Sequence, residues 1–238
     1  MIELINIDCP QYHTDNIHLY NCDCMDIMRQ LPDKWADLAI TDPPYGIGED
    51  GRKNHTRGCL AISRNYSNNN KYDIEPPPRE YFVELRRISK NQIIWGANHF
   101  ISRNPYDSSC WIVWDKDNGE TDFADCELAY TSFKTAVRKF RYRWQGMLQE
   151  NMKNKEVLIH PNHKPTALYK WLLRNYAKPK DRIFDSHGGS MSSVIAAYDG
   201  NFDMVCCELD EDYFKAARKR FETHKLQQKL WKGYSNLT

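Results

Sequence analysis

Short runs of apolar residues alternate along the chain with segments that carry apolar residues at helical spacing. Brief apolar runs bounded by polar turns are typical of buried strands, whereas apolar positions three and four residues apart are typical of amphipathic helices. The pattern predicts strands at residues 17–20, 38–40, 92–95, 111–114, 127–132, 137–144, 182–185 and 202–208. It predicts helices at residues 24–31, 80–88, 166–176, 190–198 and 210–223.

This alternation of strands and helices favours an α/β fold, in which helices cover both faces of a mostly parallel sheet. A chain of 238 residues suits one domain with a single core, so we expect residues 1–238 to form one unit. Residues 49–75 are polar and rich in asparagine, and we expect them to form a long mobile loop. The polar tail after Lys225 is expected to fray.

Composition narrows the class of protein. The formal net charge is only +1, so any nucleic-acid surface must be a local patch. The eight cysteines include no CxxC pair with a matching second half, so we expect no metal site and buried, reduced thiols. Apolar runs are too short for a membrane span, and the first residues do not resemble a secretory signal. We therefore expect a cytoplasmic protein without membrane partners.

The most informative motif is Asp42-Pro43-Pro44-Tyr45, which follows the apolar strand at 38–40. Two prolines remove two backbone donors and end the strand in a rigid turn, at the sheet edge where α/β proteins bind ligands. The Asp42 carboxylate and the Pro43 carbonyl can accept hydrogen bonds from an aromatic amine, and Tyr45 can stack on a base that has left its duplex. The alternative is a proline turn that only ends a strand.

Two segments are candidates for contact with DNA. In residues 133–144, three basic side chains share one strand face and three aromatic side chains share the other. The basic residues are Lys139, Arg141 and Arg143, and the aromatic residues are Phe140, Tyr142 and Trp144. The second candidate is the loop at 49–75, with Arg52, Lys53, Arg57 and Arg64. The alternative for both is a solvated charged surface, which is also the interpretation of the basic run at 215–220.

The catalytic turn resembles that of the DNA amino-methyltransferases, which methylate the N6 amine of adenine or the N4 amine of cytosine after flipping the base. The resemblance covers roughly residues 16–223 and implies a Rossmann-like fold, a mostly parallel seven-stranded sheet, S-adenosylmethionine as cofactor and DNA as partner. In that family a leading aspartate goes mainly with adenine, so Asp42 implies a site-specific adenine methyltransferase. The methyl group would pass directly from sulfonium to nitrogen, without a covalent enzyme intermediate.

The second half of the chain resembles the family's cofactor-binding half, residues 158–223. His160, Pro161, Lys164 and Pro165 match the segment before the first cofactor helix, and Lys164 is expected to pair with the methionine carboxylate. A carboxylate at a strand end can bind the ribose hydroxyls, and backbone amides at a helix start can bind a carboxylate. The resemblance therefore implies a cofactor site formed by Asp23, Asp42, Lys164, Asp185, His187, Gly188, Gly189, Ser190 and Glu208.

The motifs occur in the order of the circularly permuted beta class, with the catalytic half (16–150) before the cofactor half. The glycine turn departs from the family's usual Asp-Pro-Phe-x-Gly-Ser-Gly, because His187 replaces the aromatic residue and Met191 the second glycine. This form resembles phage-like modification methylases, and His187 could either contact the cofactor or only pack against the turn. The host would be a bacterial or phage-infected cell.

Three alternatives stay open. The acceptor could be the amine of cytosine, or, as for related turns that begin with asparagine, a protein glutamine or RNA. The chain could also be a catalytically silent subunit that binds DNA or cofactor. Residues 146–158 are too short for a separate recognition domain, so DNA contacts must come from the loop, from the 133–144 strand or from a partner chain. A homodimer and a restriction partner are both compatible with the sequence.

Overall fold

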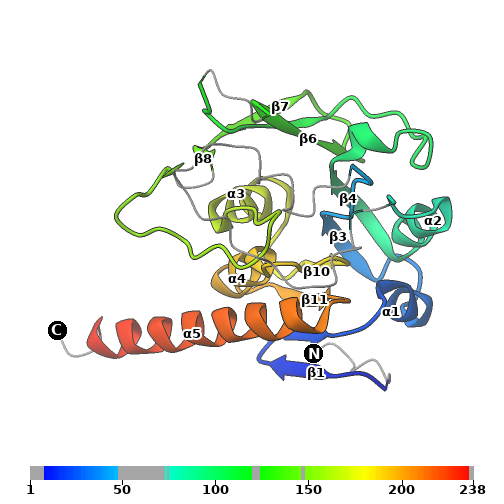
Figure 1. The fold of residues 1–238 in the computed structure, drawn as a ribbon. Helices are drawn as coiled ribbons and strands as arrows, with labels where there is room; N and C mark the ends of the chain where they lie inside the picture. Colours follow the sequence, from blue (N-terminus) through cyan, green and yellow to red (C-terminus); the bar gives the residue numbers. More distant parts are fainter. Residues whose placement is uncertain (1–7, 48–72, 74, 120–123, 146–147, 236–238) are drawn as a thin grey trace.

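A computed structural model describes residues 8–47, 73, 75–119, 124–145 and 148–235 (Figure 1). Nine strands form one sheet in the order β1-β2-β11-β10-β3-β4-β6-β5-β7, and β8 pairs with β9 in a separate hairpin. The strands of the large sheet are β1 (Gln11–Thr14), β2 (Ile17–Tyr20), β3 (Ala36–Thr41), β4 (Ser89–Trp95), β5 (Ile112–Asp115), β6 (Cys126–Thr131), β7 (Arg138–Arg141), β10 (Arg182–Asp185) and β11 (Asp203–Cys207). The small hairpin consists of β8 (Trp144–Gln145) and β9 (Leu148–Gln149).

The central strands β2, β11, β10, β3 and β4 run parallel to one another. Antiparallel pairing occurs towards the edges, where β1 pairs with β2 and where β6 pairs with both β4 and β5. The edge strand β7 is parallel to β5. The expected α/β class and mostly parallel sheet are confirmed.

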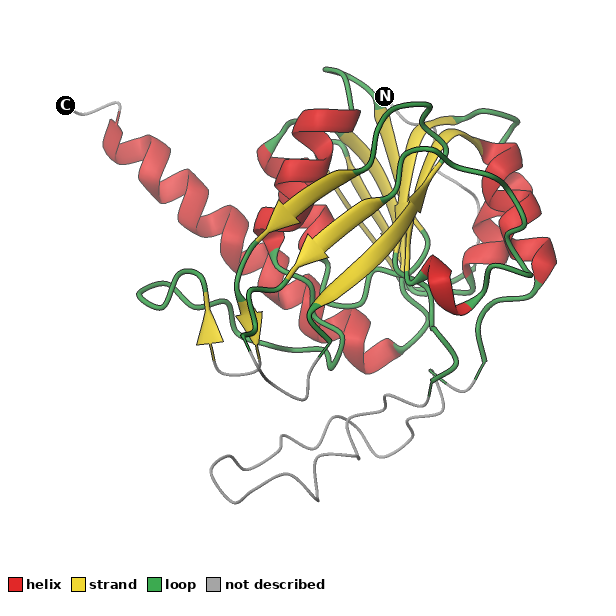
Figure 2. Cartoon of the chain, turned by 90° about the horizontal axis from the view of Figure 1, so that it is seen from above, coloured by secondary structure: helices red, strands yellow, loops and turns green. Residues whose placement is uncertain are grey.

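Helices cover both faces of the sheet (Figures 1 and 2). One face packs against α1 (Cys24–Gln30) and α2 (Arg79–Ile88), and the other against α3 (Thr166–Tyr176), α4 (Ser192–Asp199) and α5 (Glu211–Ser235). A short 3-10 helix, η2 (Ala97–His99), follows β4. No helix in the part of the chain that the structure describes is long and apolar enough to cross a membrane.

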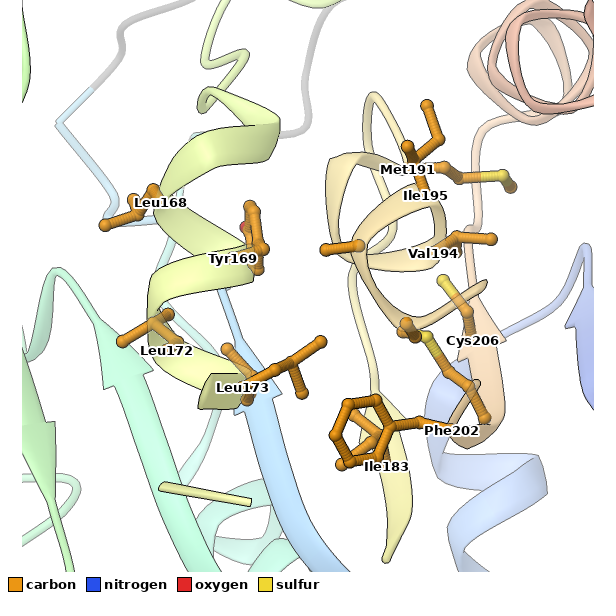
Figure 3. Packing of buried hydrophobic residues seen from close by; sticks show 14 of the residues in the cluster. Leu168, Tyr169, Leu172, Leu173, Ile183, Met191, Val194, Ile195, Phe202 and Cys206 are labelled. Atoms are coloured by element: carbon orange, nitrogen blue, oxygen red, sulfur yellow. The ribbon is translucent and has the colours of Figure 1, made fainter. Parts of the chain in front are cut away.

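Each face of the sheet carries its own apolar cluster, because the central strands are covered on both sides. On the α3–α4 face, Leu168 and Leu172 pack with Val194, Ile183 and Cys206, and all five are fully buried or nearly so (Figure 3). On the other face, residues of α2 such as Phe82 and Leu85 pack against the strands. Two apolar interfaces thus hold the sheet in place beneath its carboxyl edge.

The helix after β10 covers one face of the sheet and the helix after β3 covers the other. The chain therefore reverses its winding between these two neighbouring strands. In open parallel sheets such a reversal leaves a crevice at the carboxyl ends of the strands, where ligands bind. Asp42 follows β3, and Ser186 follows β10, so the predicted site residues lie at this crevice.

Several sequence-based predictions need correction. The sheet has nine strands rather than seven, because β1 adds a strand at one edge and β7 completes the other. The strand expected at 137–144 ends at Arg141, where its register with β5 stops, and Trp144 begins β8 instead. The last helix does not end near Thr223 but continues to Ser235, through the segment expected to fray.

Candidate active site

The Asp-Pro-Pro-Tyr turn leaves β3 at the carboxyl edge of the sheet, as predicted. Its Tyr45 hydroxyl donates to Asp42 Oδ1 at 2.6 Å. The Tyr45 ring stacks on His99 with centroids 5.1 Å apart and also lies against Gly96. Gly96 has φ +66°, and a Cβ there would lie 2.0 Å from the Tyr45 ring, so the close packing of this ring requires glycine.

A chain of alternating charges surrounds Asp42. Lys164, only 4% exposed, donates to Asp42 Oδ2 and to the Tyr45 hydroxyl, and its Nζ lies 3.1 Å from Glu127 Oε2. Lys116 Nζ lies 2.5 Å from the other oxygen of Glu127. The resemblance implies that Lys164 pairs with the carboxylate of a cofactor, but Asp42 and Glu127 hold its ammonium instead.

The turn is anchored from outside by Asp73, a residue that belongs to none of the motifs found in the sequence. Its carboxylate is 2% exposed and accepts hydrogen bonds from the backbone amides of Tyr45 at 2.7 Å and Gly46 at 2.9 Å. A single carboxylate thus satisfies two consecutive donors that follow the prolines. Asp73 therefore holds the backbone that carries both Asp42 and Tyr45.

We predict that Asp73→Ala slows methyl transfer about 10- to 100-fold, because displacing a reacting group by ~1 Å can cost that much. Two buried amides would be left without their acceptor, and we expect the unfolding free energy to fall by ~1–3 kcal/mol. Thermal denaturation and turnover should be measured beside Asp33→Ala, since Asp33 has a side chain that is 77% exposed. Wild-type turnover in the Asp73 variant would show that the turn is rigid without this anchor.

A cavity of about 550 Å³ opens beside the turn, a size typical of small-molecule sites. Residues from the ends of four parallel strands line it: Cys22 and Asp23 after β2, Asp42 to Pro44 after β3, Ser186 to Ser190 after β10, and Glu208 after β11. Tyr81 of α2, Tyr213 of α5, and His160, Asn162 and Lys164 before α3 complete most of its wall. Most of the predicted cofactor residues therefore share one cavity.

Glu208 is the buried acid of this cavity. It is 9% exposed, and its two oxygens accept from the amides of Gly189 at 2.7 Å and Asp210 at 2.9 Å. Burial raises the pKa of Glu208 to about 7, although these backbone hydrogen bonds oppose the rise. The carboxylate at the end of β11 is thus placed to accept from further donors, such as a diol.

The glycine turn brings backbone close to the cavity. A Cβ at Gly188 would lie 2.7 Å from Cys206 Sγ, and Gly189 has φ +49°. His187 both lines the cavity and packs edge-on against Tyr81, with centroids 5.5 Å apart. Burial lowers the pKa of His187 to about 4, so its ring is neutral at pH 7. His187 therefore contributes an uncharged aromatic wall at this turn.

Two predicted cofactor residues have structural roles. Asp23 lines the cavity, and its carboxylate also caps α1 by accepting from Met25 N at 2.8 Å. Asp185 lies behind the cavity wall rather than on it. Its oxygens accept from Ser193 Oγ at 2.6 Å and His187 N at 3.1 Å. We infer that Asp185 shapes the glycine turn from within.

The predicted basic surface lies along the edge strand β7 (Figure 1). Lys139, Arg141 and Arg143 have side chains that are 62%, 66% and 49% exposed, and they pair with Asp115 or Asp117. Since β7 is parallel to β5, its carboxyl end emerges beside Lys116, which contacts Glu127 of the active site. The candidates in the loop expected at 49–75, which are Arg52, Lys53, Arg57 and Arg64, lie outside the described residues.

Comparison with known proteins agrees with this geometry. The sequence profile of the DNA methylase family, which comprises the N6 and N4 methyltransferases, matches residues 58–219. The chain therefore belongs to this family.

Curated relatives include the type II methyltransferase M2.MboI of Moraxella bovis, 22% identical, with 89% of this chain and 90% of that protein covered. The type II methyltransferase M.HinfI of Haemophilus influenzae is also 22% identical, with 83% of this chain and 66% of that protein covered.

Solved structures share the fold. The PvuII cytosine-N4-specific DNA methyltransferase superposes with a TM-score of 0.58 at 14% identity, over 91% of this chain and 90% of that one. TTHA0409 of Thermus thermophilus, a DNA modification methylase complexed with S-adenosylmethionine, gives 0.55 at 15% identity, over 88% and 96%. The M1.HpyAVI–SAM complex gives 0.51 at 20% identity, over 86% and 99%.

Proposed function

We propose that this DNA methylase transfers a methyl group from S-adenosylmethionine to the N6 amine of adenine, with Asp42 as the acceptor for that amine. The observation that carries the proposal is the position of the Asp42 carboxylate, at the end of β3 and on the wall of the cavity. The leading aspartate of the turn, which in the family goes mainly with adenine, supports the choice of base.

The cavity fits the cofactor by its chemistry. The buried Glu208 carboxylate matches a ribose diol, and the glycine turn after β10 allows the close backbone approach that a nucleoside and its amino-acid tail need. The rings of His187 and Tyr213 offer apolar walls. S-adenosylmethionine supplies a methyl group on a sulfonium when bound. On this proposal residues 158–223 bind the cofactor and residues 16–150 present the base.

Asp42 and the Pro43 carbonyl act on the amine. An aromatic amine is a poor nucleophile because its lone pair is delocalised into the ring. Hydrogen bonds from both N–H groups to Asp42 and Pro43 orient that lone pair and disperse the positive charge that develops on nitrogen. Asp42 Oδ1 and Oδ2 each accept one hydrogen bond from Tyr45 and Lys164, so each oxygen keeps a lone pair for the amine.

Tyr45 positions both the acid and the base. Its hydroxyl fixes Asp42, while its ring is stacked on the exposed side chain of His99. A flipped adenine would take the place of the His99 ring on this face, because base–aromatic stacking offsets part of the cost of unstacking.

The choice of base can be tested in cells. DNA from methylation-deficient bacteria that express the chain should contain N6-methyladenine after digestion to nucleosides and mass spectrometry. Cells expressing Asp42→Ala should contain none. N4-methylcytosine in place of N6-methyladenine would keep the proposed site and overturn the proposed base.

DNA binding is proposed for the β7 surface. Replacing Lys139, Arg141 and Arg143 together by alanine should weaken binding to duplex DNA and reduce the slope of log affinity against log salt by about 0.9 for each phosphate that the variant no longer neutralises. Alanine at Lys215, Arg218 and Lys219 of α5, on another side of the sheet, removes the same charge and is the control. Equal effects of the two sets would indicate a general charge effect rather than a β7 surface.

A further inference from the structure

Glu127 is a buried carboxylate that the proposed chemistry has not used. It lies on β6, which crosses the sheet antiparallel to β4. The backbone amide of Gly96 donates to the carbonyl of Leu128, so the start of β6 is fixed beside the end of β4. This pairing brings Glu127 to the catalytic turn, where the Tyr45 hydroxyl lies 3.5 Å from its Oε2.

Glu127 belongs to a row of four charged side chains. Its Oε2 is 3.1 Å from Lys164 Nζ, which also contacts Asp42, and its Oε1 is 2.5 Å from Lys116 Nζ. Burial opposes its ionisation, but the two ammonium groups hold the pKa of Glu127 down at about 2. The row therefore contains two carboxylates and two ammonium groups, and its net charge is zero.

The arrangement has a consequence for Asp42. An ammonium with one carboxylate partner would draw on the lone pairs of Asp42 alone. Sharing Lys164 with Glu127 divides that attraction and leaves Asp42 a better acceptor for a third donor. The same contacts hold the Lys164 side chain in one place, so Asp42 is oriented as well as tuned.

We propose that Glu127 is a positioning residue for methyl transfer, which divides the Lys164 ammonium between two carboxylates and so keeps Asp42 a strong acceptor for the target amine. This inference rests on the proposed function of Asp42. Glu127 acts through Lys164 and is not itself expected to touch the base. Lys116 supports it by balancing its second oxygen.

Glu127 should shift the pH dependence of the reaction in a definite direction. Charged or titratable groups that face Asp42 are Tyr45 of its own turn, Lys164 before α3, Glu127 of β6, Tyr169 of α3 and Asp185 of β10. Burial raises the pKa of Asp42 most, Lys164 lowers it and Glu127 raises it. Removing the charge of Glu127 should therefore lower the pKa of Asp42, and activity should persist to lower pH.

The test is the single-turnover rate of methyl transfer from pH 5 to 9, with saturating S-adenosylmethionine and DNA. We expect Glu127→Gln to slow transfer at pH 8 by about 10- to 100-fold, as misplacement of a reacting group does. Its acid limb should move to lower pH, while the cofactor dissociation constant changes by less than about twofold. The control is Glu84→Gln, whose side chain is 23% exposed against 21% for Glu127 and pairs with Arg87 away from the cavity.

A second variant protects the test against misfolding. Lys116→Met removes the other partner of Glu127 and leaves an excess negative charge, so its acid limb should move to higher pH. A purely structural role for Glu127 would not shift the two variants in opposite directions. Unchanged rate and pH profile in Glu127→Gln, or shifts of the same sign in both variants, would overturn the inference. No transfer by the wild-type protein would instead refute the proposed function.

Discussion

Asp42→Asn should lower the rate of methyl transfer by at least about 1,000-fold, within the range that a positioned catalytic acid or base contributes. Asparagine keeps the size of the side chain but replaces one acceptor oxygen by a donor, which would face the N–H of the amine. It also leaves the buried Lys164 with only one carboxylate partner, Glu127. Transfer of labelled methyl groups to DNA measures the rate, and calorimetric titration measures cofactor affinity.

Cofactor affinity in this variant should stay within about threefold of the wild-type value, because Glu208 and the glycine turn remain in place. Asp37→Asn is the matched control. Asp37 lies on the same strand at its amino end, where it pairs with Lys90 at 2.6 Å. An Asp42→Asn protein that transfers methyl groups at more than about a tenth of the wild-type rate would remove Asp42 from the catalytic role.

Glu208→Gln should weaken cofactor binding by about 100-fold, or ~2.7 kcal/mol, as expected when charge-assisted hydrogen bonds are removed from a buried site. In the wild-type protein, affinity should fall as the pH drops below about 7, because burial raises the pKa of Glu208 to about 7 and protonation removes an acceptor for the ribose hydroxyls. Affinity falls on the acid side because the ionised carboxylate is the form that binds the diol.

The titration must be assigned to Glu208, since burial raises the pKa of Asp185 to about 7 as well. Asp185 lies behind the cavity wall, so the pH dependence should disappear in Glu208→Gln even though Asp185 is present. Glu211→Gln serves as the control, because Glu211 is exposed at the start of α5 and does not line the cavity. Wild-type affinity that stays constant from pH 5.5 to 8.5 would contradict the assigned role of Glu208.

The central strands and most helices could be predicted because burial on both faces gives each strand a nearly continuous apolar run. The segments predicted at 17–20, 166–176 and 182–185 match β2, α3 and β10. The edge strand β1 could not be predicted, because Gln11–Thr14 is only partly buried and carries no apolar run. The end of β7 depends on its register with β5, which no local pattern contains.

The candidate site was predictable to a similar degree. Asp42, Gly188 and Glu208 could be found because each follows an apolar strand in a recognisable motif. Glu127 and Asp73 could not, since they reach the catalytic turn through contacts between segments far apart in sequence. The change of partner for Lys164 has the same origin, because only the folded chain places Glu127 beside it.

The most direct test of the proposed function is the reaction of the purified protein with methyl-labelled S-adenosylmethionine and unmethylated DNA, followed by separation of the nucleosides. We predict label in N6-methyladenosine for the wild-type protein and none for Asp42→Asn. Absence of label with any DNA, while the cofactor binds measurably, would contradict the proposed function.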